Sequence, residues 1–180
     1  MSKRLEANPP AGDTVYSERR FALRLCPIPL TDGRETRRGV VIHGGSVVLV
    51  PITRDGQIVL IRNRRWQLGQ ALLELAAGTR ETHETPAECA ARELAEETGY
   101  TADELIPLPP IFALPGLTTE IMYPFMARGL TSVGQSLEVD EEIEVVSYPA
   151  ETVRRMLIDG EIYDAKSMAV LGRVLLAGLI

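Results

Sequence analysis

The sequence of 180 residues predicts an α/β fold in which a mixed sheet is packed between helices. Two observations predict it. Short β-branched and apolar runs recur along the chain between glycine, proline and aspartate, as expected of strands. Three longer segments instead carry the start and stop signals of helices, and they lie among or after the strands. The length fits a single domain with a substantial core.

The first 43 residues are predicted to form a tail and an arm. Residues 1–13 include two adjacent prolines and lack the apolar stretch of a secretory signal, so we expect a flexible tail. Residues 14–43 alternate short apolar and polar runs around a turn at residues 31–33, which predicts a β-hairpin or meander. Because so small a hairpin is not stable alone, this β-rich arm must pack on something else. Residues 44–180 then form the main domain.

Several strands are predicted within the main domain. Residues 46–53 and 57–62 are rich in valine, isoleucine and leucine, and the turn signal at residues 54–56 predicts that they follow each other as a hairpin. A short strand is expected at residues 72–76. Further strands are expected at residues 111–114, 121–128 and 143–148.

Residues 86–98 carry the clearest helix signal. Thr85 is an N-cap residue, Pro86 suits the first helical position, and Glu88 completes a capping box. Gly99 is a natural stop. Two further helices are predicted at residues 149–158 and 164–176, the second with Asp164 as its N-cap.

One face of the predicted 86–98 helix is acidic. At about 100° per residue, Glu93, Glu96 and Glu97 fall on the same side, opposite the small and apolar positions. Like charges at this spacing repel by a few tenths of a kcal/mol per pair, and no lysine occurs in residues 78–100 to relieve them. A solvated acidic helix face is the alternative explanation for a run of this kind. Together they form an oxygen cluster of the kind that binds Mg²⁺.

The spacing of residues 78–100 resembles the Nudix box, in which G, five residues, E, seven residues and R-E-U-x-E-E-x-G-U recur, with U a bulky apolar residue. The matching positions are Gly78, Glu84, Arg92, Glu93, Leu94, Glu96, Glu97, Gly99 and Tyr100. The resemblance implies an α/β/α sandwich with a mixed sheet. It also implies a hydrolase that cleaves a phosphoanhydride bond with Mg²⁺, for which Mn²⁺ can substitute.

The same resemblance implies roles for the residues of the box. Glu93 and Glu97 are expected to be the main metal ligands, with Glu96 as a further ligand and catalytic residue. Arg92 is expected to orient the acidic face by pairing with Glu84. Ala77 can contribute a backbone carbonyl to the metal.

A general base outside the box is also implied, because water must lose a proton as it attacks phosphorus. Relatives place a loop glutamate in this role. The candidates here are Glu138, Glu141 and Glu142, and we favour Glu141 or Glu142 because they directly precede the strand predicted from residue 143.

The segments that flank the box resemble ADP-ribose pyrophosphatases. They are LLELAAG at residues 72–78, PGLTTE at residues 115–120, and residues 140–171, which resemble the acidic loop, strand and C-terminal helices of those enzymes. Glu120 in the second segment is a candidate for substrate binding. The expected substrate is therefore a nucleoside diphosphate sugar, with ADP-ribose giving AMP and ribose 5-phosphate. GDP-mannose or another such sugar is the alternative. A nucleoside triphosphate hydrolase and a non-catalytic binding protein remain less favoured, because of the proline-glycine segment and the intact box respectively.

Basic and aromatic residues supply the remaining substrate candidates. Guanidinium groups suit phosphate, and the candidates are Arg37, Arg38, Arg62, Arg64 and Arg65, although each can equally be a solvated strand end. Trp66 is the candidate for stacking on the base, with Tyr16 and Phe21 as alternatives. The run at residues 64–66 departs from the pattern of many relatives, which leaves the particular sugar nucleotide open.

Charge and composition narrow the partners. The net charge of −6 argues against general nucleic-acid binding, and no apolar run approaches the length of a membrane span. Without an export signal we expect a cytoplasmic protein in which Cys26 and Cys89 are reduced thiols. The resemblance implies a homodimer in which Arg37, Arg38 and an aromatic residue of the arm reach the second subunit's substrate.

Overall fold

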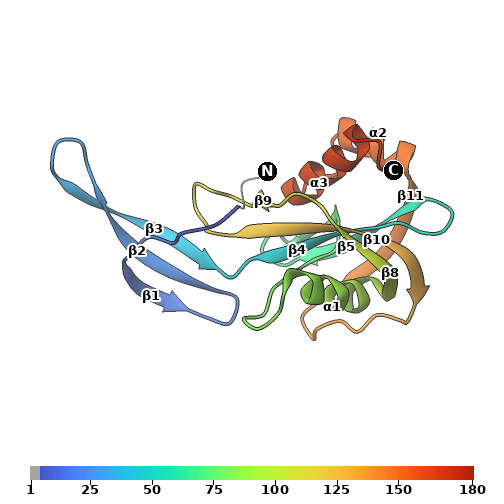
Figure 1. Cartoon of the computed structure of the whole chain (residues 1–180), viewed down its shortest axis with the longest axis horizontal. Helices are drawn as coiled ribbons and strands as arrows, with labels where there is room; N and C mark the ends of the chain where they lie inside the picture. The colour runs from blue at the N-terminus through green and yellow to red at the C-terminus, as the bar shows by residue number, and fades with distance from the viewer. Residues whose placement is uncertain (1–4) are drawn as a thin grey trace.

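The computed structural model describes residues 5–180, which form an elongated arm and a larger body (Figure 1). The arm is an antiparallel meander of β1 (Asp13–Ser17), β2 (Phe21–Pro29) and β3 (Glu35–His43). This confirms the predicted strand-rich arm. The expected tail at residues 1–13 lies partly outside the described residues, since it includes residues 1–4. The described part has no regular structure before β1, and the backbone oxygen of Pro10 accepts a 2.8 Å hydrogen bond from Arg24.

The larger sheet of the body is mixed, as predicted. Its strand order is β7 (Ala77–Thr79), β4 (Ser46–Pro51), β10 (Ile121–Ser132) and β8 (Tyr100–Pro107), with β9 (Ile111–Phe112) paired to β10. The β4 and β10 strands run parallel, whereas the other neighbours are antiparallel. The β7 and β8 strands were not predicted, because β7 has only three residues and β8 carries two adjacent acidic residues, Asp103 and Glu104.

A second sheet of the body has the order β11 (Ile143–Pro149), β5 (Gln57–Arg65) and β6 (Gln70–Glu74). The predicted hairpin between residues 46–53 and 57–62 is therefore wrong. The β4 and β5 strands lie in different sheets. The two segments are joined near the turn by an isolated bridge between Ile52 and Ile58 and by a 2.9 Å hydrogen bond from the N–H of Thr53 to the carbonyl of Gln57. The physical reason is that β4 is buried along its whole length, and its two edges are already paired with β7 and β10.

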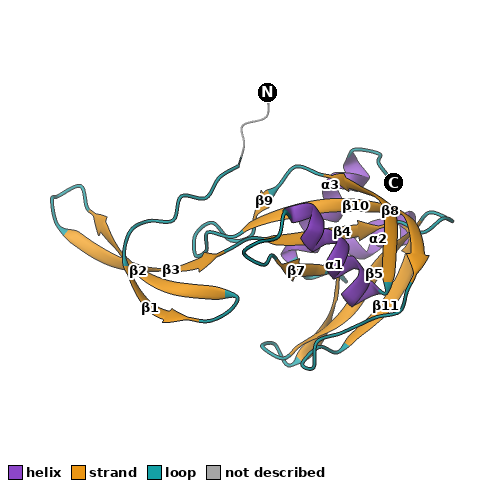
Figure 2. Ribbon diagram, turned by 60° about the horizontal axis from the view of Figure 1, so that its bottom comes forward, coloured by secondary structure: helices purple, strands orange, loops and turns teal. Residues whose placement is uncertain are grey.

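Helices cover both faces of the body (Figure 2). The predicted helices are confirmed as α1 (Pro86–Thr98), α2 (Ala150–Ile158) and α3 (Ala165–Leu176). Alternate residues of β4 point to opposite sides. Val47 and Leu49 pack in the core cluster that contains α1, whereas Val48 and Val50 pack with α2 and α3. The arrangement is an α/β/α sandwich with two hydrophobic cores.

The ends of α1 follow the local signals in the sequence. The backbone N–H of Thr85 donates to the Glu88 carboxylate at 2.8 Å, and the N–H of Glu88 donates to the Thr85 hydroxyl at 3.3 Å. Gly99 ends the helix with φ 70°, a left-handed conformation that glycine adopts without strain. The helix is thereby set with Cys89, Ala90 and Leu94 in the core.

In residues 5–180, no helix is long and apolar enough to cross a membrane.

Candidate active site

The acidic face of α1 meets the sheet at β7. Gly78 faces Glu93 there, and a Cβ atom built on Gly78 would lie 1.8 Å from Cδ of Glu93. Any larger residue would displace the carboxylate, so this glycine provides the space in which Glu93 lies. Glycine is needed here because the backbone and the Glu93 side chain approach each other closely.

Two of the acidic side chains are held in a largely buried position. Glu97 accepts a 2.8 Å hydrogen bond from the backbone N–H of Ala77, and the two residues Glu93 and Glu97 are 8% and 4% exposed. Burial raises the pKa of Glu93 to about 7 and that of Glu97 to about 8, and the negative charge of Glu141 adds to both increases. A bound cation would stabilise the ionised form of both groups.

Arg92 is the centre of an ion-pair network on the same face. Its guanidinium forms a bidentate pair with Glu84, at 2.7 and 2.9 Å. Its Nη1 donates to Glu93 at 2.7 Å and to Glu96 at 2.9 Å. The hydrogen bond from Arg92 lowers the pKa of Glu84 to about 2. Glu84 therefore stays ionised and orients the guanidinium, which in turn orients two carboxylates of the helix.

The donor set on this face suits a hard divalent cation. Glu93, Glu96, Glu97, Glu141 and Ala77 all line one pocket with a volume of about 720 Å³. Carboxylate and carbonyl oxygens are the ligands that Mg²⁺ and Mn²⁺ prefer. Within residues 5–180, no group of three acidic, histidine or cysteine side chains is arranged as a metal-binding cluster. Instead, Arg92 is hydrogen-bonded to Glu93 and Glu96. The residues fit a metal whose binding would weaken these two hydrogen bonds.

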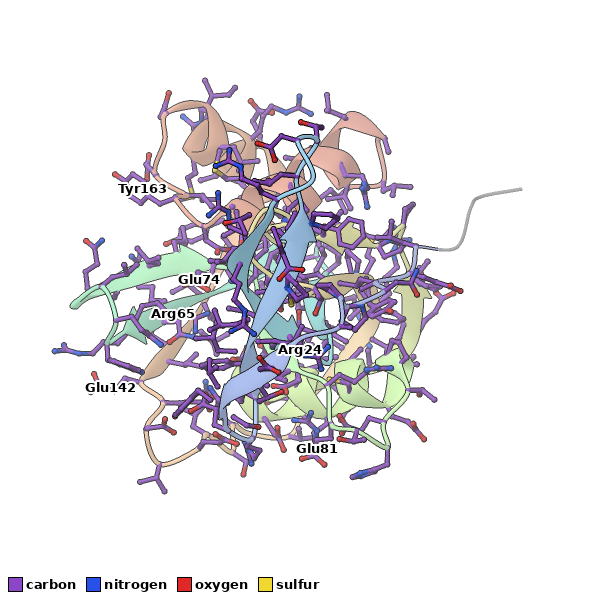
Figure 3. All side chains as sticks on the ribbon, turned by 90° about the vertical axis from the view of Figure 1, so that its left-hand side faces the viewer. Arg24, Arg65, Glu74, Glu81, Glu142 and Tyr163 are labelled. Carbon is purple, nitrogen blue, oxygen red and sulfur yellow. The ribbon has the colours of Figure 1, made fainter. Side chains whose placement is uncertain are left out.

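The structure separates the three loop glutamates that were candidates for the base. Glu141 lines the pocket together with the acidic face of α1. Glu138 also reaches the pocket, but its two oxygens accept hydrogen bonds from Arg19 and Arg20 at 2.8 Å each. Glu142 lies 3.6 Å from Arg64, and its side chain is 73% exposed at the periphery of the view in Figure 3.

Of the predicted substrate residues, some line the pocket and others lie outside it. Glu120 lines the pocket and accepts a 2.7 Å hydrogen bond from the hydroxyl of Ser46. Arg37 pairs with Asp13 inside the arm, and Arg38 is exposed on β3. Trp66 is 74% exposed at the turn between β5 and β6 and does not line the pocket of its own chain.

A buried ionic cluster borders the pocket, and its members Glu74, Asp164 and Lys166 were absent from the predicted site. Arg65 forms a bidentate pair with Glu74 at 2.9 and 2.6 Å, and the two side chains lie side by side in Figure 3. Lys166 donates to Glu74 at 2.6 Å and to Asp164 at 2.8 Å. A glutamate inside the apolar run LLELAA was the available signal, because a charged residue in a buried strand requires partners.

The sandwich, the capped helix and the glutamate-lined pocket define a Nudix-type hydrolase. The NUDIX domain family matches residues 43–170, and the chain belongs to this family. The chain is 32% identical over 167 residues to an ADP-ribose pyrophosphatase of Bacillus subtilis (strain 168), covering 92% of this chain and 90% of that protein. It is thus an enzyme of the ADP-ribose pyrophosphatase-like type.

Other relatives carry different names. A GDP-mannose pyrophosphatase of Klebsiella pneumoniae is 34% identical over 183 residues, covering 93% of this chain and 91% of the relative. A methanol dehydrogenase activator of Bacillus methanolicus is 29% identical, covering 93% and 92%. A crystal structure of an ADP compounds hydrolase superimposes with a TM-score of 0.77 at 24% identity, covering 99% of this chain and 98% of the other, which supports the fold.

Proposed function

We propose that the protein hydrolyses the diphosphate bond of a nucleoside diphosphate sugar, with ADP-ribose as the first candidate, giving AMP and ribose 5-phosphate. The observation that carries the proposal is that the acidic face of α1 and the cluster around Arg65 and Lys166 line the same pocket. Its volume of about 720 Å³ lies within the range of small-molecule sites, roughly 300–1,000 Å³.

In this proposal Glu93, Glu96 and Glu97, with the carbonyl oxygen of Ala77, hold Mg²⁺, for which Mn²⁺ can substitute. When bound, the metal neutralises the diphosphate and the charge that develops as the phosphorus–oxygen bond breaks. Arg92 keeps the carboxylates of the helix in register through its pairs with Glu84, Glu93 and Glu96.

We assign the role of general base to Glu141. It lines the pocket that contains the metal ligands, whereas Glu138 is neutralised by two arginines and Glu142 faces Arg64. The Glu141 carboxylate takes a proton from water as the water oxygen bonds to phosphorus. The anhydride oxygen leaves with the other phosphate, so that each product carries one phosphate group.

A second substrate, GDP-mannose, is favoured by one observation. Proteins named GDP-mannose pyrophosphatase match the chain at identities similar to those of the ADP-ribose pyrophosphatases. The test is hydrolysis of ADP-ribose, GDP-mannose and a deoxynucleoside triphosphate with Mg²⁺, read by product chromatography. AMP with ribose 5-phosphate supports the proposal, whereas GMP with mannose 1-phosphate supports the alternative. Pyrophosphate release or lack of turnover on all three would overturn the proposal.

The arm supports a further part of the proposal, a homodimer. It extends beyond the body and exposes Val15, Tyr16, Ile28 and Leu30. An apolar surface of this kind suits burial against a second copy of the chain. Four of the proposed substrate residues do not line the pocket of their own chain: Arg37, Arg38, Arg64 and Trp66. Their proposed contact with substrate therefore requires the second subunit. The cytoplasmic location and the domain boundary at residues 43–44 remain predictions.

A further inference from the structure

The two turns of the arm have different surroundings. The β1–β2 turn points toward α1, whereas the β2–β3 turn lies at the opposite end of the molecule (Figure 1). Arg19 and Arg20, in the first of these turns, line the pocket of their own chain. Arg34, in the second turn, pairs with its neighbour Asp32 at 2.7 Å and does not line the pocket. One end of the arm is therefore part of the active-site wall.

Arg19 and Arg20 converge on a single carboxylate. Each donates to a different oxygen of Glu138 at 2.8 Å, across 119 and 118 residues of sequence. The hydrogen bond from Arg19 and the charges of both arginines hold the pKa of Glu138 below its ordinary value. All three side chains are substantially exposed, and exposed ion pairs contribute little to stability. The main effect of these two ion pairs is therefore to hold the Glu138 side chain in place.

Glu138 and Glu141 are joined by two hydrogen bonds within one turn of the loop. The backbone N–H of Glu138 donates to the carboxylate of Glu141 at 2.9 Å. The backbone N–H of Glu141 donates back to the carbonyl of Glu138 at 3.1 Å. The side chain of the proposed base is thus oriented by the backbone of the residue that the arm holds.

The rest of the loop is attached to the body. On one side, the amide of Gln135 donates to the carbonyl of Glu97 at 2.7 Å, and the N–H of Ser136 donates to the carbonyl of Glu96 at 3.1 Å. On the other side, the N–H of Arg64 donates to the carbonyl of Glu142 at 3.0 Å. Between these two attachment points, the loop also contacts the arm, through the ion pairs of Glu138 with Arg19 and Arg20.

We propose that Glu138, held by Arg19 and Arg20, is a positioning residue that keeps Glu141 directed at the acidic face of α1. The arm then takes part in the chemistry of its own chain, separately from any contact with a second subunit. This inference rests on the proposed function in one respect, which is the role of Glu141 as the base. The orientation of the loop itself is independent of that role.

Turnover tests the inference through a split between kcat and KM. In the Arg19→Gln/Arg20→Gln double variant and in Glu138→Gln, kcat should fall about tenfold, a part of the ~10²- to 10⁴-fold that a placed general base contributes. KM and the Mg²⁺ requirement should stay within about twofold, because no proposed metal ligand changes. The matched control is Arg34→Gln, which removes an exposed, ion-paired arginine from the other turn of the arm and should leave kcat unchanged.

Charge reversal tests the contact itself. Arg19→Glu/Arg20→Glu should lose activity at least as strongly as the glutamine variant. Adding Glu138→Arg to it should restore part of the lost kcat, since the ion pairs are re-formed with opposite signs. A loss of activity that this third substitution deepens would contradict a direct contact.

Hydrogen exchange gives a readout that does not depend on turnover. Exchange of the backbone amides of residues 137–142 should accelerate severalfold in Arg19→Gln/Arg20→Gln and not in Arg34→Gln. Unchanged exchange would overturn the inference, and so would a raised KM with normal kcat, which would make the two arginines substrate contacts. If the wild type hydrolyses none of the tested substrates, the proposed function fails, and the exchange experiment still decides whether the arm holds the loop.

Discussion

The arm and the body of this protein are stabilised in different ways. All six residues of β4 are buried in the body, and a separate hydrophobic cluster packs on each of its faces. In residues 13–43, Cys26 is the one fully buried apolar side chain, and every residue of β1 is exposed. The body therefore carries its own core, whereas the arm depends on contacts at its ends and surface.

The difference extends to the chemistry of the pocket. The body contributes the acidic groups of α1, and the arm contributes the guanidinium groups of Arg19 and Arg20. Substitutions of the acidic groups of α1 should therefore lower turnover strongly without unfolding the protein. Substitutions in the arm should change how the loop and the substrate are held.

The largest effect is expected from Glu97→Gln. Loss of a metal ligand should lower kcat by at least ~10²-fold, which corresponds to about 2.7 kcal/mol of transition-state stabilisation. The fold should survive, because the glutamine oxygen can still accept the Ala77 N–H. Steady-state kinetics and thermal unfolding measure the two outcomes. Near-normal turnover by the folded variant would show that Glu97 is not a ligand.

Glu141→Gln should lower kcat on the order of 10²-fold with little change in the affinity for Mg²⁺, since a proton acceptor and not a principal ligand is lost. The matched control is Glu142→Gln, which changes the adjacent, exposed carboxylate and should stay within about threefold of the wild type. Kinetics across a Mg²⁺ titration distinguish the two variants. If both retain full activity, the base lies elsewhere, for example in the box itself.

Removal of residues 1–43 would test the arm as a whole. We expect a monomer by light scattering, a KM raised by about tenfold, a kcat lowered about as much as in Arg19→Gln/Arg20→Gln, and an unchanged metal requirement, because the arm supplies substrate and loop contacts but no proposed ligand. Circular dichroism should show that the helices of the body persist. A full-length protein that is monomeric at micromolar concentration and fully active on ADP-ribose would contradict the dimer.

The smallest effect concerns the stability of the body. Burial alone would raise the pKa of Asp164, but Lys166 and Ser167 outweigh it, and the pKa lies below its ordinary value of 3.8. A depressed pKa means that the ionised group stabilises the native state above pH 3.8, and that this contribution is lost as the pH falls through the native pKa.

Asp164→Asn should therefore lower the free energy of unfolding by about 1 kcal/mol at pH 7, while the amide oxygen can still cap α3. The difference from the wild type should shrink toward zero as the pH is lowered below 3.8. Denaturant unfolding across pH measures it, with the exposed Asp159→Asn as a control of equal charge change. A difference that is independent of pH would mean that packing, and not charge, is responsible.

Local signals predicted the box helix and the C-terminal helices well. Thr85, Pro86, Glu88 and Gly99 act within a few residues of one another, so their effect on α1 can be inferred without the rest of the chain. The turn at residues 54–56 was equally local, yet the strands on either side entered different sheets. Strand pairing depends on what covers the two edges of β4, which no local pattern states.

By itself, the sequence determined the class of fold, the acidic face of α1 and the residues available for a metal, because helical periodicity places Glu93, Glu96 and Glu97 together. Only the tertiary structure decided which distant groups meet that face. Arg19, Arg20 and Glu138 come together across more than a hundred residues, and Lys166 meets Glu74 across 92. Such contacts follow from the path of the chain around the sheets, and residue spacing along the sequence carries no measure of that path.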